Sequence, residues 1–92
     1  MSGSVARRAI VYGRVQGVWY RASTAEQAAV LGVRGYARNR RDGTVEVVAA
    51  GTQQDVDALL AWLWHGPPLA RVTGVEVEDV DPASVNEGFD TR

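Results

Sequence analysis

The sequence contains no cysteine and only one histidine, His65, among its 92 residues. Without thiols the chain can form neither a disulfide framework nor a thiolate nucleophile, and a single histidine argues against a histidine-based metal cluster. No apolar run approaches the roughly 20 residues of a membrane span, and the first four residues do not resemble a signal peptide. We therefore expect a cytoplasmic protein that neither enters a membrane nor holds a metal ion.

Lysine is also absent, so all ten basic residues are arginines. The net charge is −1, yet residues 1–41 carry a charge of +7 and residues 42–92 carry a charge of −8. The basic first half suits an anionic ligand, and also a nucleic acid. The acidic second half argues against a large basic face.

The length of the chain indicates one domain. By the trend of buried surface with size, 92 residues bury roughly two-thirds of the surface that the unfolded chain exposes. The sequence has no internal repeat, linker or low-complexity tract. We expect residues 1–5 to be a flexible N-terminus and residues 6–92 to be the single domain, with a monomer as the default.

Periodic apolar residues predict the element order β-α-β-β-α-β. The expected strands are residues 6–12, 33–39, 44–50 and 71–80, where β-branched residues are bounded by turn residues. The first helix ends at Gly32. The second follows Thr52, a favourable N-cap, and has an apolar stripe formed by Val56, Leu59, Leu60 and Leu63.

This order is the ferredoxin-like split βαβ arrangement. The predicted fold class is α+β: a two-layer sandwich of an antiparallel four-stranded sheet with two helices on one face. We expect a loop-like tail from residue 81, with a short pairing segment at Phe89 left open.

A glycine-bearing segment joins the first strand to the first helix, and its sequence is Gly13-Arg14-Val15-Gln16-Gly17-Val18-Trp19-Tyr20-Arg21. The two glycines allow a tight backbone path. A helix N-terminus carries exposed N–H groups and a partial positive charge, so an arginine there is mildly unfavourable unless an anion binds beside it. Free amides and Arg21 therefore indicate an anion site, with an incidental surface arginine as the alternative.

Two local signals disagree about where this helix begins. The segment Ser23-Thr24-Ala25-Glu26 is a capping-box pattern that would start the helix at Thr24. The anion site instead needs a start near Tyr20. We favour the earlier start, which places on one helix face Tyr20, Thr24, Ala28 and Leu31.

The topology predicts a partner for the glycine-bearing segment. The first and second strands run parallel, so their C-terminal ends lie at the same edge of the sheet. Asn39 ends the second strand, which places it beside the segment although 18 positions separate it from Arg21. An asparagine at a strand end is by itself most often a turn residue.

Two long motifs together resemble the signature segments of the acylphosphatase family. They are Gly13-x-Val15-Gln16-Gly17-Val18-x-Tyr20-Arg21 and Gly35-Tyr36-Ala37-Arg38-Asn39-(x)3-Gly43-x-Val45-(x)5-Gly51. Later segments also look like family features, namely Trp62-Leu63-x-x-Gly66-Pro67 and Ala70-Arg71-Val72. The resemblance covers most of the chain, in the expected order, and the family's fold is the ferredoxin-like one.

The resemblance implies metal-independent hydrolysis of a carboxyl–phosphate mixed anhydride, without any cofactor. Arg21 matches the family's phosphate-binding arginine, and Asn39 matches the asparagine that orients the attacking water. The matching phosphate cradle consists of the main-chain amides of Gln16, Gly17, Val18, Trp19 and Tyr20. The implied partner is a small-molecule acyl phosphate, with no nucleic acid and no membrane.

Other polar residues have simpler interpretations. His65 ends the second helix, where a cation suits the dipole, so we interpret it as structural. Asp42 and Glu46 are interpreted as surface residues of the hairpin. Two alternatives remain for Arg38, Arg40 and Arg41: they attract an anionic substrate, or they are simply a solvated turn.

Two other functions remain as alternatives. Arg34-Gly35-Tyr36-Ala37 matches the first four positions of the RNP1 pattern of RNA-recognition domains, which share this element order. The match then fails at Arg38-Asn39 and falls on the second strand instead of the third. The other alternative is an acylphosphatase-like module that binds phosphate without turnover.

Overall fold

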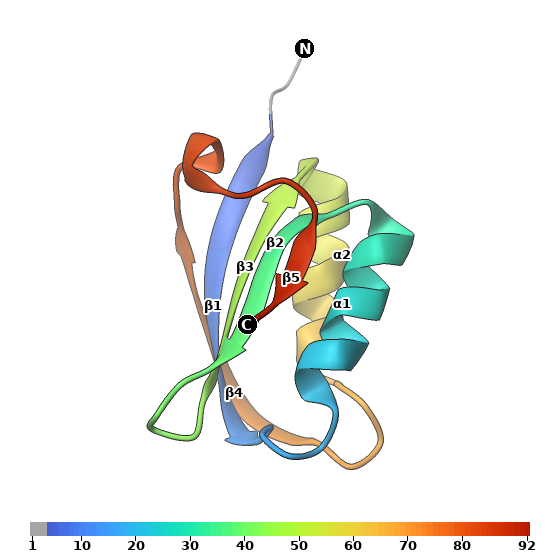
Figure 1. Ribbon diagram of the computed structural model, residues 1–92, viewed down its shortest axis with the longest axis vertical. Coiled ribbons are helices and arrows are strands. Elements are labelled where there is room, and N and C mark those ends of the chain that lie inside the picture. The colour runs from blue at the N-terminus through green and yellow to red at the C-terminus, as the bar shows by residue number, and fades with distance from the viewer. Residues whose placement is uncertain (1–3) are drawn as a thin grey trace.

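The computed structural model describes residues 4–92 and contains a five-stranded sheet in the order β4-β1-β3-β2-β5 (Figure 1). β1 pairs antiparallel with β3 and β4, and β3 pairs antiparallel with β2. β1 and β2 therefore run in the same direction with β3 between them. The strands are β1 (Val5–Arg14), β2 (Arg34–Asn39), β3 (Val45–Gly51), β4 (Arg71–Asp79) and β5 (Phe89–Thr91).

Two helices, α1 (Tyr20–Leu31) and α2 (Gln53–Leu63), cover one face of the sheet (Figure 1). Thr52 caps α2, because its side chain accepts a hydrogen bond from the main-chain N–H of Asp55 at 3.2 Å. The core between helices and sheet contains alternate residues of the central strands and the predicted helix stripes. Its members include Ala9, Val11, Val45, Val47, Tyr20, Ala28, Val56, Leu59 and Leu63.

The fold confirms the predicted ferredoxin-like class, but the sheet has five strands and is mixed. β5 pairs in parallel with β2 at the edge of the sheet. The predicted four-stranded antiparallel sheet therefore lacked this fifth strand. Main-chain bonds at both ends hold β5: Gly35 donates to Gly88 at 2.8 Å, and Arg92 donates to Ala37 at 2.8 Å. The segment before β5 contains a short 3-10 helix, η1 (Pro82–Ser84).

α1 begins at Tyr20, as the earlier of the two predicted starts requires. Thr24 does not cap the helix. Its side chain is buried and its hydroxyl donates to the main-chain oxygen of Tyr20 at 2.8 Å, one turn earlier. The capping-box pattern therefore lies inside the helix. At the other end, Gly32 has a left-handed conformation (φ 73°), which ends the helix as predicted.

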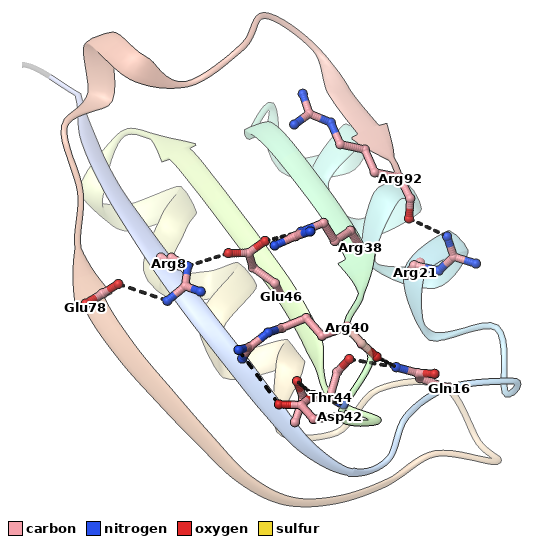
Figure 2. A network of polar contacts seen from close by, with 10 residues as sticks. All are labelled: Arg8, Gln16, Arg21, Arg38, Arg40, Asp42, Thr44, Glu46, Glu78 and Arg92. Carbon is pink, nitrogen blue, oxygen red and sulfur yellow. Dashed lines mark hydrogen bonds and ion pairs between the residues drawn. The ribbon is translucent and has the colours of Figure 1, made fainter.

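The opposite face of the sheet carries an ion-pair network (Figure 2). Glu46 is only 3% exposed, so its interpretation as a surface residue was wrong. Its carboxylate accepts hydrogen bonds from Arg8 and Arg38, each at 2.5 Å. Burial by itself would raise the pKa of Glu46, but the bonds from these two arginines outweigh it and lower the pKa.

Residues 1–3 of the expected flexible N-terminus lie outside the described residues, and β1 begins at Val5. Within residues 4–92, no helix is long and apolar enough to cross a membrane. Because β1, β2 and β5 run in the same direction, their C-terminal ends all lie at the same end of the sheet, beside the start of α1 (Figure 1).

Candidate active site

The glycine-bearing segment starts with an irregularity in β1. The register between β1 and β4 shifts between Tyr12 and Gly13, and Gly13 has φ 120°. A Cβ atom at Gly13 would lie 2.0 Å from the main-chain oxygen of Arg71, so only glycine fits. This bulge shifts the register of β1 against β4 just before the strand ends at Arg14.

Burial on both sides of Trp19 determines where α1 begins. Val18 and Tyr20 are both buried in the main core. The Tyr20 hydroxyl donates to the main-chain oxygen of Leu63 at 2.6 Å, which ties the first residue of α1 to the last turn of α2. Burial raises the pKa of the Tyr20 hydroxyl, which suits this structural role.

The first turn of α1 has free main-chain donors. Trp19 is the N-cap, but its side chain makes no capping hydrogen bond, and the first turn contains no acidic residue. The N–H groups of an uncapped first turn carry a partial positive charge and have no partner within the helix. The start of α1 can therefore accept an anion.

A pocket of about 380 Å³ lies at this helix start, and both Arg21 and Asn39 line it. The strand register explains why they meet. Asn39 lies opposite Val45, on the same face as Ala37, so its side chain is on the side of the sheet that α1 covers. The complete lining is Val15, Gly17, Trp19, Tyr20, Arg21, Ala22, Asn39 and Thr91.

Most of the predicted site residues therefore lie together. Gly17, Trp19 and Tyr20 line the pocket with Arg21 and Asn39. The remaining two predicted cradle residues, Gln16 and Val18, do not line it, and Val18 instead has a buried side chain.

The Arg21 side chain reaches the residue that follows β5. Its Nη1 donates to the main-chain oxygen of Arg92 at 2.6 Å (Figure 2). A guanidinium has five N–H donors, so this bond orients the group and leaves most donors for an anion. Within residues 4–92, Arg21 forms no ion pair with an Asp or Glu side chain.

Gln16 acts through its side chain, which sequence reasoning did not consider. Its Nε2 donates to the main-chain oxygens of Arg40 and Thr44, at 2.8 and 2.9 Å (Figure 2). These oxygens belong to the turn that follows Asn39. Asp42 shapes the same turn by accepting bonds from the N–H and hydroxyl of Thr44, and these bonds lower the pKa of Asp42.

Sequence reasoning also missed Thr91 as a lining residue. Thr91 reaches the pocket because β5 pairs in parallel with β2, where Ala37 lies opposite Thr91. No local motif marks Thr91. The weak strand signal around Phe89 was the only indication that this segment would join the sheet.

Further arginines lie on one side of the pocket, next to Asn39. Arg38, Arg40 and Arg41 line a shallow hollow of about 560 Å³ that shares Asn39 with the pocket. Arg38 pairs with Glu46 at 2.5 Å, and Arg40 lies 3.8 Å from Asp42. Part of this positive charge is therefore compensated, while Arg41 forms no ion pair within residues 4–92.

The pocket lining contains no carboxylate and no imidazole, and the hydroxyl of its one tyrosine, Tyr20, donates to the main-chain oxygen of Leu63. No group of three or more His, Asp or Glu side chains within residues 4–92 could hold a metal ion. What the pocket offers is positive charge, main-chain N–H donors and one neutral amide side chain. Such a set can bind an anion and hold a water molecule beside it.

The fold and pocket define the class of protein: a ferredoxin-like domain with a pocket at the start of its first helix that can accept an anion. A family model described as acylphosphatase matches residues 7–91. An acylphosphatase of Methylococcus capsulatus is 61% identical over 71 residues, which are 77% of this chain and 77% of the relative. An acylphosphatase of Acidovorax sp. is 48% identical over 91 residues, which are 99% of this chain and 93% of the relative.

A solved structure agrees with these relatives. The crystal structure of an acylphosphatase from Bacillus subtilis matches with a TM-score of 0.91 at 30% identity, covering 96% of this chain and 98% of that one. The chain therefore belongs to the acylphosphatase family. Its activity is that of an acylphosphatase, and its substrate is an acyl phosphate.

Proposed function

We propose that Arg21 and the main-chain amides of residues 16–20 bind the phosphoryl group and that Asn39 orients the attacking water. The observation that carries this proposal is that Arg21 and Asn39 line one pocket at the uncapped start of α1. Gly17, Trp19 and Tyr20 line the same pocket, so their amides are the ones nearest to a bound phosphate. Phosphoryl transfer needs mainly positioning and charge stabilisation, which these groups supply.

The reaction balances without a further catalytic group. The oxygen of water attacks phosphorus while the bond from phosphorus to the acyl oxygen breaks, and the electron pair leaves with the carboxylate. A carboxylic acid has a pKa of about 4, so the leaving group departs without a proton donor. The phosphoryl oxygens accept the proton from water, and Arg21 and the amides stabilise the charge on them.

Asn39 suits the role of holding water. A neutral amide side chain can donate and accept hydrogen bonds but cannot deprotonate water. Asn39 is the last residue of β2 and therefore has its main chain held by the sheet. Arg21 is in the first turn of α1, so both groups are on regular elements, which hold their geometry more precisely than loops do.

The test is hydrolysis of a synthetic acyl phosphate, measured with and without EDTA. We expect Arg21→Ala to reduce kcat/KM by about a thousandfold and to abolish inhibition by inorganic phosphate. Asn39→Ala should reduce kcat by a similar factor while inorganic phosphate still inhibits. Arg7→Ala, which removes an arginine paired with Asp79 at 3.1 Å on another part of the sheet, is the control and should keep full activity.

Two results would contradict parts of the proposal. Full activity of Asn39→Ala would show that another group orients the water. Loss of activity with EDTA alone would contradict metal-independent hydrolysis.

We further propose a cytoplasmic monomer without a nucleic-acid partner. Tyr36 of the RNP1-like segment supports this last point, because the guanidinium of Arg92 lies over its ring at 4.1 Å and occupies a stacking face.

A further inference from the structure

Trp19 lines the pocket and is exposed to solvent. Trp19 has 77% of its surface accessible to solvent, whereas both of its neighbours in sequence are buried. A tryptophan normally contributes stability by burying 150–250 Å². Trp19 contributes little in that way, so its side chain calls for another explanation.

The main chain of Trp19 is held in a conformation that a bulky side chain disfavours. Trp19 has φ 67°, the only positive φ of a non-glycine residue within residues 4–92. Its main-chain oxygen accepts the first hydrogen bond of α1, from Ser23 at 3.0 Å, so this conformation belongs to the ordered helix start. Glycine or asparagine would adopt it with less strain. Strained residues of this kind are concentrated at ligand sites.

The rest of the pocket divides into two parts. Arg21, Asn39 and the main-chain amides account for the phosphoryl group and the water. The apolar part of the lining is Trp19 together with the small residues Val15 and Ala22, and the phosphoryl chemistry uses none of these side chains. Arg21 is the only charged side chain in the lining, so a second charge on the substrate would find no partner there.

We propose that the indole of Trp19 is the binding platform for the acyl group, and that it selects acyl phosphates whose acyl group is apolar and planar, aromatic ones above all. This inference rests on the proposed function, because the phosphoryl group must first be fixed at the helix start. The acyl group then extends from the phosphate toward the pocket mouth. An aromatic ring gains a stacking contact with the indole that a methyl group cannot make.

The experiment compares benzoyl phosphate with acetyl phosphate, which differ only in the acyl group. We expect Trp19→Gly to lower kcat/KM for benzoyl phosphate about tenfold more than kcat/KM for acetyl phosphate. Glycine fits the positive φ, so the substitution adds no backbone strain. Trp19→Phe keeps an aromatic ring and should retain most of the preference. Trp64→Ala, which removes another exposed tryptophan at the end of α2, should leave the ratio unchanged.

If Trp19→Gly leaves the ratio of the two kcat/KM values unchanged, the inference is overturned. It is also overturned if Trp19→Phe loses as much of the preference for benzoyl phosphate as Trp19→Gly does. If Trp19→Gly also loses inhibition by inorganic phosphate, Trp19→Asn replaces it, since asparagine tolerates a positive φ. A preference kept by phenylalanine and lost with asparagine supports the platform. A native protein that hydrolyses neither acyl phosphate would refute the proposed function instead, so the two failures are distinguishable.

Discussion

Gln16 and Thr44 are joined across the pocket's edge: the side-chain Nε2 of Gln16 donates to the main-chain oxygen of Thr44 at 2.9 Å. The same Nε2 donates to Arg40, the residue after Asn39, at 2.8 Å. One side chain therefore ties the segment that leads to Arg21 to the turn that follows Asn39. We therefore expect this connection to influence the distance between the proposed phosphate and water positions.

Removing the Gln16 side chain should loosen that connection. We expect Gln16→Ala to lower kcat about tenfold, because small misplacements of a bound water slow the reaction strongly. The free energy of unfolding should fall by about 1–2 kcal/mol, since two carbonyl oxygens lose their partner. Kinetics and urea denaturation measure the two effects.

Gln53→Ala is the matched control for Gln16→Ala, because Gln53 is an exposed glutamine in the first turn of α2. It should change neither kcat nor stability measurably. A Gln16→Ala variant with native kcat would show that the bulge and the helix start position the segment without the glutamine.

Glu46 should make stability depend on pH. Because its folded-state pKa is lowered from 4.5, its contribution is fully present above that value and is lost as the pH falls through the lower folded-state pKa. We expect Glu46→Gln to reduce the free energy of unfolding by about 2 kcal/mol at pH 7, and by progressively less below pH 4.5.

Chemical denaturation between pH 3 and pH 7 tests this dependence. Glu26→Gln, on the exposed face of α1, is the control and should change stability little at any of these values. If the loss of unfolding free energy in Glu46→Gln stays constant down to pH 3, the ion pairs with Arg8 and Arg38 do not cause the pH dependence of stability.

Arg41 distinguishes the two interpretations of the arginine-rich turn. Arg41 is exposed and lines the hollow beside Asn39. If its charge attracts the anionic substrate, Arg41→Glu should lower kcat/KM about threefold at low ionic strength and leave kcat unchanged. The effect should disappear at about 0.5 M salt, where screening shortens the range of the interaction.

Gln54→Glu is the control for Arg41→Glu, because it adds a negative charge at the exposed start of α2, a helix that follows the opposite end of β3. It should leave kcat/KM unchanged. Equal values of kcat/KM for Arg41→Glu and the native protein at low salt would favour the simple solvated turn.

The Tyr20 hydroxyl should stabilise the junction between the helices. Tyr20→Phe leaves the buried main-chain oxygen of Leu63 without its 2.6 Å partner, so we expect a loss of about 1–2 kcal/mol in the free energy of unfolding. Tyr12→Phe removes a hydroxyl that bonds to exposed Glu76 at 2.7 Å, and it should cost less than about 0.5 kcal/mol. Similar losses for both variants would contradict the structural role of the Tyr20 hydroxyl.

The sequence correctly predicted those parts of the fold that depend on side chains within a single segment. The stripe of α2 and its cap at Thr52 follow from side chains within one segment, and both are present. The capping-box pattern at Ser23 was also local, but it did not determine the start of α1. Burial of Tyr20 and Val18 against residues distant in sequence places the start four residues earlier than Thr24.

Parts that depend on pairing between distant segments could not be predicted in the same way. β5 contains only three residues, and its stability comes from Ala37 and Gly35 of β2, more than fifty positions earlier. Glu46 was predicted to be a surface residue because it alternates with apolar residues along its strand. No motif marks Arg8 and Arg38 as its partners. For the site, the two motifs indicated Arg21 and Asn39, whereas the bond from Gln16 to Thr44 joins segments whose contact no motif marks.

The start of α1 presents its main chain to the pocket, and this has a consequence for how acylphosphatases of this kind diverge. Every residue except proline supplies the same N–H group, so substitutions in the proposed cradle can preserve phosphate binding while replacing the side chain beside the acyl group. Trp19 sits at such a position. Under the proposal made for Trp19, substrate preference would change through one codon, while the groups proposed to bind phosphate and water stay the same.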